Sequence, residues 1–127
     1  MAKFASDLVM DAALSYVDDC TILTVCSAQP TTYAEATTTY KLADIVMTAG
    51  AGNGDYTLAN GDVSGRKLTV LQQANVDIDS SGTANHVALC ITGSSALVYV
   101  TTCTSQALTA GGTVTIPEFD IEISDPS

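Results

Sequence analysis

Three carboxylates alternate with apolar residues near the C-terminal end of the chain, in the segment IPEFDIEISDPS. Glu118, Asp120 and Glu122 occupy every second position, so an extended strand would place them on one face, about 6.6–7 Å apart. That separation falls within the roughly 6.5–9.5 Å between the two carboxyl groups of inverting glycosidases. Such chemistry also requires one carboxyl group with a raised pKa, and an open strand face lacks the burial that raises it. The row therefore does not predict a catalytic pair.

The same row could hold a metal ion or dock on a partner. Carboxylates along one straight strand converge poorly on a calcium ion, which takes ligands from several directions. A strand with its apolar residues facing inward and its acids facing solvent would produce the same row, and no functional site is needed to explain it. We prefer this interpretation, and docking on a basic partner stays open as the alternative. We therefore predict no metal and no cofactor, and keep Glu118, Asp120 and Glu122 as a candidate acidic docking face.

Two further motifs resemble functional signatures but lack a required part. DIDSSG matches the first half of an EF-hand loop, yet Ala88 stands where the last position requires a bidentate Glu. GAGNGD has Asp55 where a dinucleotide fingerprint requires its third glycine, and no Lys-Ser or Lys-Thr pair follows as in a phosphate-binding loop. We expect a turn at the first motif and a flexible loop at the second.

The cysteines and the single histidine do not form a recognisable metal or catalytic pattern. No C-x-x-C spacing occurs, and His86 has no Cys, Ser or carboxylate placed beside it by spacing. We expect the four cysteines to be reduced, buried thiols, with a disulfide or metal role as the alternative. These are Cys20, Cys26, Cys90 and Cys103. No group of residues in the sequence predicts an enzyme.

The charge balance excludes two classes of partner. The chain has 127 residues, of which 14 are acidic and 4 are basic, for a net charge of −10. Four scattered cations cannot supply the counterion release that nucleic-acid binding requires, and an acidic surface is repelled by anionic membranes. No apolar run reaches the roughly 18 residues of a membrane span. Asp7 and Asp11 interrupt the region where a signal peptide would be apolar, so we expect synthesis in a cytoplasm.

One helix is predicted, over residues 7–19, after an N-terminal arm at residues 1–6. Asp7 is a suitable cap, and apolar residues follow at helical spacing. The main stripe consists of Met10, Ala13, Leu14 and Val17, and a second, weaker stripe consists of Leu8, Ala12 and Tyr16. Asp18 and Asp19 oppose the negative end of the helix dipole, which predicts that the helix ends there.

The remainder, residues 20–127, is predicted as about seven or eight short strands. Residues 37–49 read as a strand, and hairpins are expected at Asn60-Gly61 and at the Ser-Ser-Gly turn of residues 80–82. Inward-facing positions change from even to odd numbers at Pro117, which predicts a bulge or corner at Pro117 and Glu118. We therefore predict a single domain, mainly β, built as a jelly-roll-like β-sandwich with one short N-terminal helix.

The segment TVCSAQPTTYAEATTTYKLADI, at residues 24–45, resembles a family of small virion proteins encoded in the structural-gene region of tailed bacteriophages. The likeness continues through YTLANGDVSGRKLTV, GTANHVALC and TTCTSQALTAGGTVTIPEFDIEISDP, so it covers nearly the whole chain. The family has no catalytic or metal motif to transfer. The resemblance implies a place in the virion, reached by assembly in the cytoplasm of a host bacterium.

Two structural roles are open under that resemblance. A capsid decoration (cement) protein sits on the outside of the capsid, usually as a homotrimer, and bridges subunits of the major capsid protein. A head–tail joining or tail protein forms rings instead. The compact acidic sandwich with its arm and helix favours decoration, and we expect Phe4, Leu8 and Met10 to make docking contacts unless they pack on their own sandwich. A carbohydrate-binding β-sandwich module is a more distant alternative, since the chain has no Trp.

Overall fold

The structure, a computed structural model, describes residues 5–125 and confirms the mainly β class. The described residues form one α-helix, one short π-helical turn and nine strands, one more than the upper end of the expected range. In chain order they are α1 (Asp7–Asp18), β1 (Ile22–Cys26), η1 (Glu35–Thr39), β2 (Lys41–Val46), β3 (Tyr56–Asn60), β4 (Arg66–Val70), β5 (Gln73–Asp77), β6 (Gly82–Ile91), β7 (Ala96–Leu108), β8 (Thr113–Ile116) and β9 (Phe119–Ile123).

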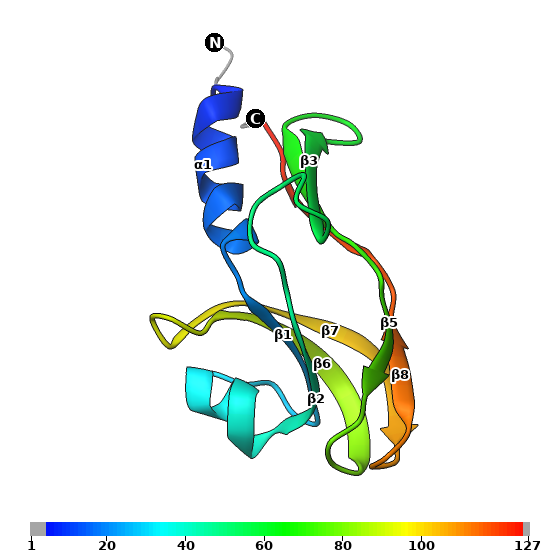
Figure 1. The fold of residues 1–127 in the computed structure, drawn as a ribbon. Helices are drawn as coiled ribbons and strands as arrows, with labels where there is room; N and C mark the ends of the chain where they lie inside the picture. The colour runs from blue at the N-terminus through cyan, green and yellow to red at the C-terminus, as the bar shows by residue number, and fades with distance from the viewer. Residues whose placement is uncertain (1–4, 126–127) are drawn as a thin grey trace.

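The strands form three antiparallel sheets in a sandwich-like arrangement. The largest has the order β2-β1-β6-β7, the second β3-β4-β9 and the third β5-β8. Figure 1 shows the four-stranded sheet crossing the lower half of the molecule, with α1 and the β3 region above it and the β5-β8 pair at one side. The inner faces of all three sheets and one face of α1 enclose the main hydrophobic core.

Large side chains from α1 and from two of the sheets meet in this core. Leu14, Leu23, Leu68 and Leu89 are each no more than 1% exposed, and Tyr56 is fully buried. The Tyr56 hydroxyl donates a hydrogen bond of 2.9 Å to the backbone carbonyl of the residue at position 20, which satisfies the one polar atom of this side chain. The core therefore joins β3 to the segment that follows α1.

The predicted helix is confirmed, with its cap one residue earlier than expected. Ser6, not Asp7, is the N-cap, and its hydroxyl accepts a hydrogen bond of 3.4 Å from the Val9 N–H. Asp7 is the first helical residue, where its charge favours the positive end of the helix dipole. Within the predicted main stripe, Met10 and Leu14 are buried.

The strand predicted at residues 37–49 is wrong at both ends, since β2 spans only Lys41–Val46. Residues 35–39 form the turn η1, in which the Tyr40 N–H donates to the Glu35 carbonyl at 2.9 Å. The Glu35 side chain accepts hydrogen bonds from the backbone and hydroxyl of Thr31, and the Glu35 N–H donates to the Thr32 hydroxyl at 3.1 Å. These local side-chain bonds outweigh the strand preference of the β-branched threonines, since they satisfy the donors at the start of the turn.

One of the two predicted hairpins is confirmed and the other is wrong. Strands β3 and β4 pair as expected, joined by residues 61–65. Strand β5, however, pairs with β8 and not with β6. Beyond β5, Ile78 bridges to Ala43, and the backbone N–H groups of Asp79 and Ser80 both donate to the Leu42 carbonyl. These bonds carry the chain from one sheet to another, so the turn at residues 80–82 is a crossing between sheets.

The predicted corner at Pro117 is confirmed. Strand β8 ends at Ile116 and β9 begins at Phe119, so residues 117 and 118 separate them. Strand β8 pairs with β5, whereas β9 pairs with β4 in a different sheet. Proline cannot donate a ladder hydrogen bond, which explains why the pairing is interrupted at this position.

Candidate functional site

The acidic row lies on β9 and at the corner before it, with its acids facing solvent. Glu118, Asp120 and Glu122 are exposed, whereas the three apolar residues that alternate with them are half-buried against the core. This confirms the alternation that the sequence predicts for a strand with one wet face. The three carboxylates follow one surface and do not converge.

Two of these acids belong to a network with β4 and the loop between β3 and β4. Asp120 accepts a hydrogen bond of 2.7 Å from the Thr69 hydroxyl. Lys67 Nζ lies 2.6 Å from Asp62 Oδ1 and 3.8 Å from Asp120 Oδ2. Glu122 accepts a hydrogen bond of 3.1 Å from the Asp62 N–H. The row is therefore partly neutralised by Lys67, and it does not form the buried acid–base pair that hydrolysis would require.

The two other basic side chains that the structure describes are also ion-paired. Arg66 Nε lies 2.7 Å from Asp11 Oδ1 and joins β4 to α1. Lys41 Nζ lies 3.5 Å from Asp44 and 3.4 Å from Asp79. All three basic side chains between residues 5 and 125 are therefore paired with acids of the same chain.

The two motifs that resemble ligand-binding loops serve structural contacts. In DIDSSG, Asp79 pairs with Lys41 as described above. In the glycine-rich loop, Asp55 accepts hydrogen bonds from the Thr48 N–H at 2.6 Å and the Gln73 amide at 3.1 Å. The Gly50 N–H donates to the carbonyl of Asp18, at a φ of +97° that favours glycine. In the part of the chain that the structure describes, no group of three or more His, Cys, Asp or Glu side chains is placed to hold a metal ion.

The four cysteines are free thiols, and three of them are buried. Burial raises the pKa of the Cys20 thiol to about 12 and that of Cys90 to about 11, so neither is a thiolate near neutral pH. Cys103 is half-buried. His86 contacts the neighbouring Asn85 side chain, with 2.6 Å between Nδ1 and Oδ1. Neither residue type forms a nucleophile with an adjacent base.

The three residues expected to dock on a capsid have different positions. Leu8 is 80% exposed on the outer face of α1. Met10 is only 3% exposed, so its assignment as a docking contact is corrected: it packs on the chain's own core, the alternative stated above. Phe4 lies outside the described residues.

The exposed face of α1 is mostly apolar, and Asp7 and Ser15 are its exposed polar residues. Its apolar part consists of Leu8, Val9, Ala12, Ala13 and Tyr16, and we call it the α1 stripe. Val9 is 64% exposed and Tyr16 is 54% exposed. The predicted weaker stripe contained three of these five residues. Val9 could have been found on a helical wheel, because it is next to Leu8 and four residues before Ala13.

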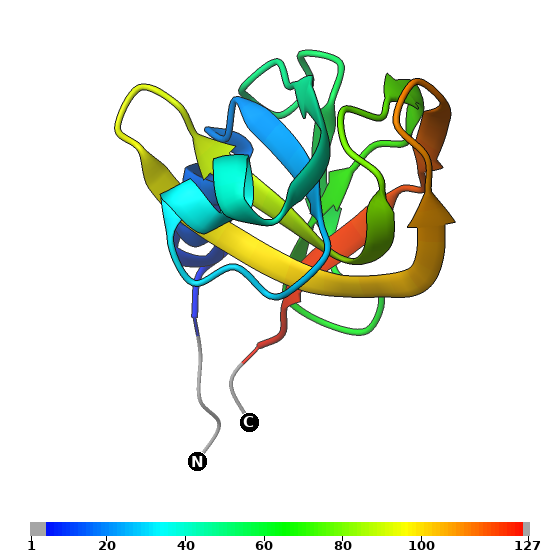
Figure 2. The same ribbon diagram turned by 90° about the horizontal axis from the view of Figure 1, so that it is seen from below.

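The α1 stripe begins at an end of the molecule where another apolar side chain is exposed. Val63, in the loop between β3 and β4, is 97% exposed. Figures 1 and 2 show the start of α1, this loop and the end of β9 at the same end of the protein. Contiguous exposed apolar patches mark interaction sites, whereas single exposed apolar side chains are ordinary, so the α1 stripe carries this argument and Val63 only adds to it. This end and the α1 stripe form the first candidate docking surface.

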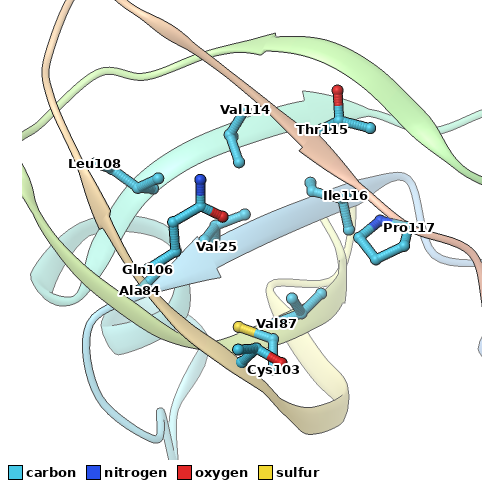
Figure 3. Close-up of a pocket in the computed structure, with 11 residues that line it drawn as sticks. Val25, Ala84, Val87, Cys103, Gln106, Leu108, Val114, Thr115, Ile116 and Pro117 are labelled. Carbon is cyan, nitrogen blue, oxygen red and sulfur yellow. The ribbon is translucent and has the colours of Figure 1, made fainter.

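A groove between β7, β8 and the Pro117 corner is the second candidate surface. Its inner part is a cavity of about 170 Å³, and its outer part has a volume of about 510 Å³. Figure 3 shows side chains of Val25, Val87, Val114 and Ile116 converging on the cavity, with Cys103 beside Val87. The cavity walls combine β1 with the consecutive strands β6, β7 and β8, so predicting the groove would have required the pairing of β1 with strands about 60 residues later in the chain.

Comparisons with known proteins give no relative from which a function could be transferred. A scan of protein-family models, a search of curated proteins and a search of solved structures each found no match to the chain. In the described residues, every helix is too short or too polar to span a membrane.

Proposed function

We propose that this protein is a non-enzymatic structural protein of a phage virion, which binds the outside of the capsid and bridges subunits of the major capsid protein. The single observation that supports the proposal most is the α1 stripe. A helix that packs one face on its own core and leaves a second apolar face in water has a surface suited to a protein partner. The resemblance of residues 24–45 to phage virion proteins supports a coat protein as the partner.

The distribution of charge supports a binding role over a catalytic role. The net charge is −10, and the described cations are already paired with acids of the same chain. An acidic decoration protein with an apolar docking stripe would bind a coat surface whose apolar patch has a basic rim, because opposite charges speed association and fix orientation.

Bridging supplies stability to the capsid without requiring tight binding by each copy. Packed DNA pushes the capsid wall outward, and a protein that contacts two coat subunits resists their separation. When several docking sites act together, as in a homotrimer, each later contact forms at a high effective concentration. Modest affinity at the α1 stripe is then sufficient for stable attachment.

The number of copies per virion tests this proposal. We expect a copy number in the hundreds, close to that of the coat protein, and density on the outer capsid surface in an electron-microscopic reconstruction. A head–tail joining protein would instead form a ring of about a dozen copies at one vertex. Finding a ring, or finding no protein on purified particles, would contradict the decoration role.

A further inference from the structure

The groove lies where three strands at sheet edges approach one another. Strand β7 is the terminal strand of its sheet, β9 is the terminal strand of the second, and β8 belongs to the two-stranded third sheet. Residues of all three, with Pro117 between β8 and β9, line the cavity or its outer part. The sandwich is therefore open along this side, and backbone groups of an edge strand are available to another extended chain.

A bulge in β7 shapes the cavity. Ala84 pairs with Gln106 and His86 pairs with Thr102, so residue 85 of β6 faces three residues of β7, 103–105. A bulge of this kind bends the strand and redirects side chains. Cys103 and Thr104 line both parts of the groove as a result. The bend also limits regular pairing along this edge to a short stretch, which suits a short segment better than a long strand.

The cavity has the size and chemistry for one apolar side chain. Its lining is mainly aliphatic, and its volume of about 170 Å³ is close to that of an engineered cavity of about 150 Å³ that binds benzene. The polar residues of the lining are Cys103, Thr104, Gln106 and Thr115. The outer part is different, since it carries the exposed carboxylate of Glu118 beside Phe119.

We propose that this groove binds an extended segment of a partner protein, which places one aliphatic or aromatic side chain in the cavity and a Lys or Arg opposite Glu118. Main-chain hydrogen bonds to a strand edge supply affinity, and a pocket for an alternate side chain supplies specificity. The proposal goes beyond docking through the α1 stripe, and it does not depend on the partner being a coat protein.

Charge selects a basic partner over a second copy of this chain. Each copy has a net charge of −10, and the acids of β9 continue outward from Glu118. A second copy would bring like charges toward this row, whereas a basic segment would be attracted to it. The 13 residues of β7 include no charged side chain that would repel such a segment.

Short synthetic peptides provide the test. The probe is an acetylated and amidated peptide, Thr-Lys-Thr-Leu-Thr-Lys-Thr, with one control that replaces Leu by Ala and a second that replaces both Lys by Glu. Binding is followed by backbone amide chemical shifts of the full chain and by protection of Cys103 from iodoacetamide. We expect shifts at Cys103, Thr104 and Val114. We also expect affinity to be about tenfold or more weaker for the Ala control, because a buried leucine side chain is lost.

Variants of the protein separate the two parts of the groove. Ala84→Leu fills the cavity from β6, and Val114→Phe fills it from β8 should the first variant fail to fold; either should abolish the preference for Leu over Ala. Glu118→Gln should weaken binding of the Lys peptide by about two- to threefold at low salt. Asp19→Asn makes the same change in net charge at the C-cap of α1 and should leave binding unchanged.

Several results would overturn the proposal. Equal affinity for the Leu and Ala peptides would exclude the cavity as an anchor site. Shifts confined to α1, or tight binding of the Glu peptide, would exclude the groove or its charge preference. Protection of Cys103 without peptide, rising with protein concentration and accompanied by dimers in sedimentation, would show that a second copy fills the groove. The peptide assay contains no capsids, so its outcome is separate from that of the virion experiment.

Discussion

The Arg66 guanidinium lies 2.7 Å from the Asp11 carboxylate, and this ion pair joins strand β4 to helix α1. Both side chains are partly shielded, at 18% and 26% exposure. Asp11 raises the pKa of Arg66 by accepting its hydrogen bond. Together with the buried Met10 and Leu14, the pair holds α1 in the orientation that exposes the α1 stripe.

Replacing either member of this pair should loosen the helix. We expect Asp11→Asn and Arg66→Gln each to lower the melting temperature by a few degrees. The decrease in the double variant should be smaller than the sum of the two single decreases. Lys67 and Asp62 are the matched control, since they are equally close but Asp62 is 68% exposed. Their double-mutant cycle should show the smaller coupling. Equal coupling for the two pairs would contradict a special role for Arg66.

Asp18 predicts a pH dependence of stability. Burial raises the pKa of its carboxyl group in the folded protein, and the charge of Asp19 adds to the effect. The folded state thus holds the proton more tightly than the unfolded state. The protonated group favours folding below the unfolded pKa of about 3.9, and this contribution is lost as pH rises through the folded pKa.

Asp18→Asn should therefore stabilise the protein at neutral pH. The Asn amide oxygen can still accept the hydrogen bond from the Ala51 N–H. We expect a higher urea midpoint than for the original chain at pH 7 and a shrinking difference as pH falls toward 4. Asp77→Asn, at an exposed position, is the control. If the difference in urea midpoint between Asp18→Asn and the original chain grew on acidification, the pKa of Asp18 would be lowered by folding and not raised.

Gly65 is required by the hairpin that carries Val63. Its φ is +75°, and a Cβ atom there would overlap the Ile123 carbonyl. We expect Gly65→Ala to lower the free energy of unfolding by about 2 kcal/mol or more. Gly52 has a φ of +86° but open space around it, so Gly52→Ala should cost only about 1 kcal/mol. Urea denaturation of both variants measures the difference, and a reversed order would contradict the contact.

Cys103 should be the first thiol to react in the native protein. Burial raises the pKa of all four thiols, but Cys20, Cys26 and Cys90 are buried whereas Cys103 is half-buried and lines the groove. We expect iodoacetamide at pH 8 to give mainly one adduct by mass spectrometry, and four after unfolding in urea. Modification of Cys20 as fast as Cys103 would show that the core opens readily.

Removing the α1 stripe should weaken attachment to capsids. We expect Leu8→Ser combined with Val9→Ser to reduce binding to particles that lack this protein by about tenfold or more, because these side chains lose their buried contacts. Val46→Ser is a matched control for Leu8, since both residues are 80% exposed and Val46 lies on a strand. Equal loss with the control variant would assign docking to another surface.

Local patterns were sufficient to predict several elements. The helical spacing of Met10 and Leu14 gave α1, and the alternation of acids with apolar residues gave β9. The inward-facing positions change from even to odd numbers at Pro117, and this change also predicted the corner between sheets. A proline and a change of inward face both occur where a strand's regular pairing is interrupted. These features depend on residues that are close in sequence.

Features that depend on distant contacts could not be predicted in this way. The partner of β5 is set by bonds around Ala43 and Leu42, more than 30 residues earlier in the chain. The groove depends on a bulge in β7, and no residue type in β7 predicts a bulge at this position. Turn η1 is intermediate, because the T-x-x-E pattern of Thr32 and Glu35 is a recognised helix-start signature that competes with the strand preference of threonine.

The corner at Pro117 has a consequence for how the protein unfolds. Residues 113–123 are a single covalent run that completes one sheet through β8 and a second through β9. Neither sheet can release its terminal strand without displacing the other, so the two should exchange their amide hydrogens at similar rates and melt together. These two of the three sheets would then behave as one cooperative unit, joined by a corner whose proline lacks a hydrogen-bond donor.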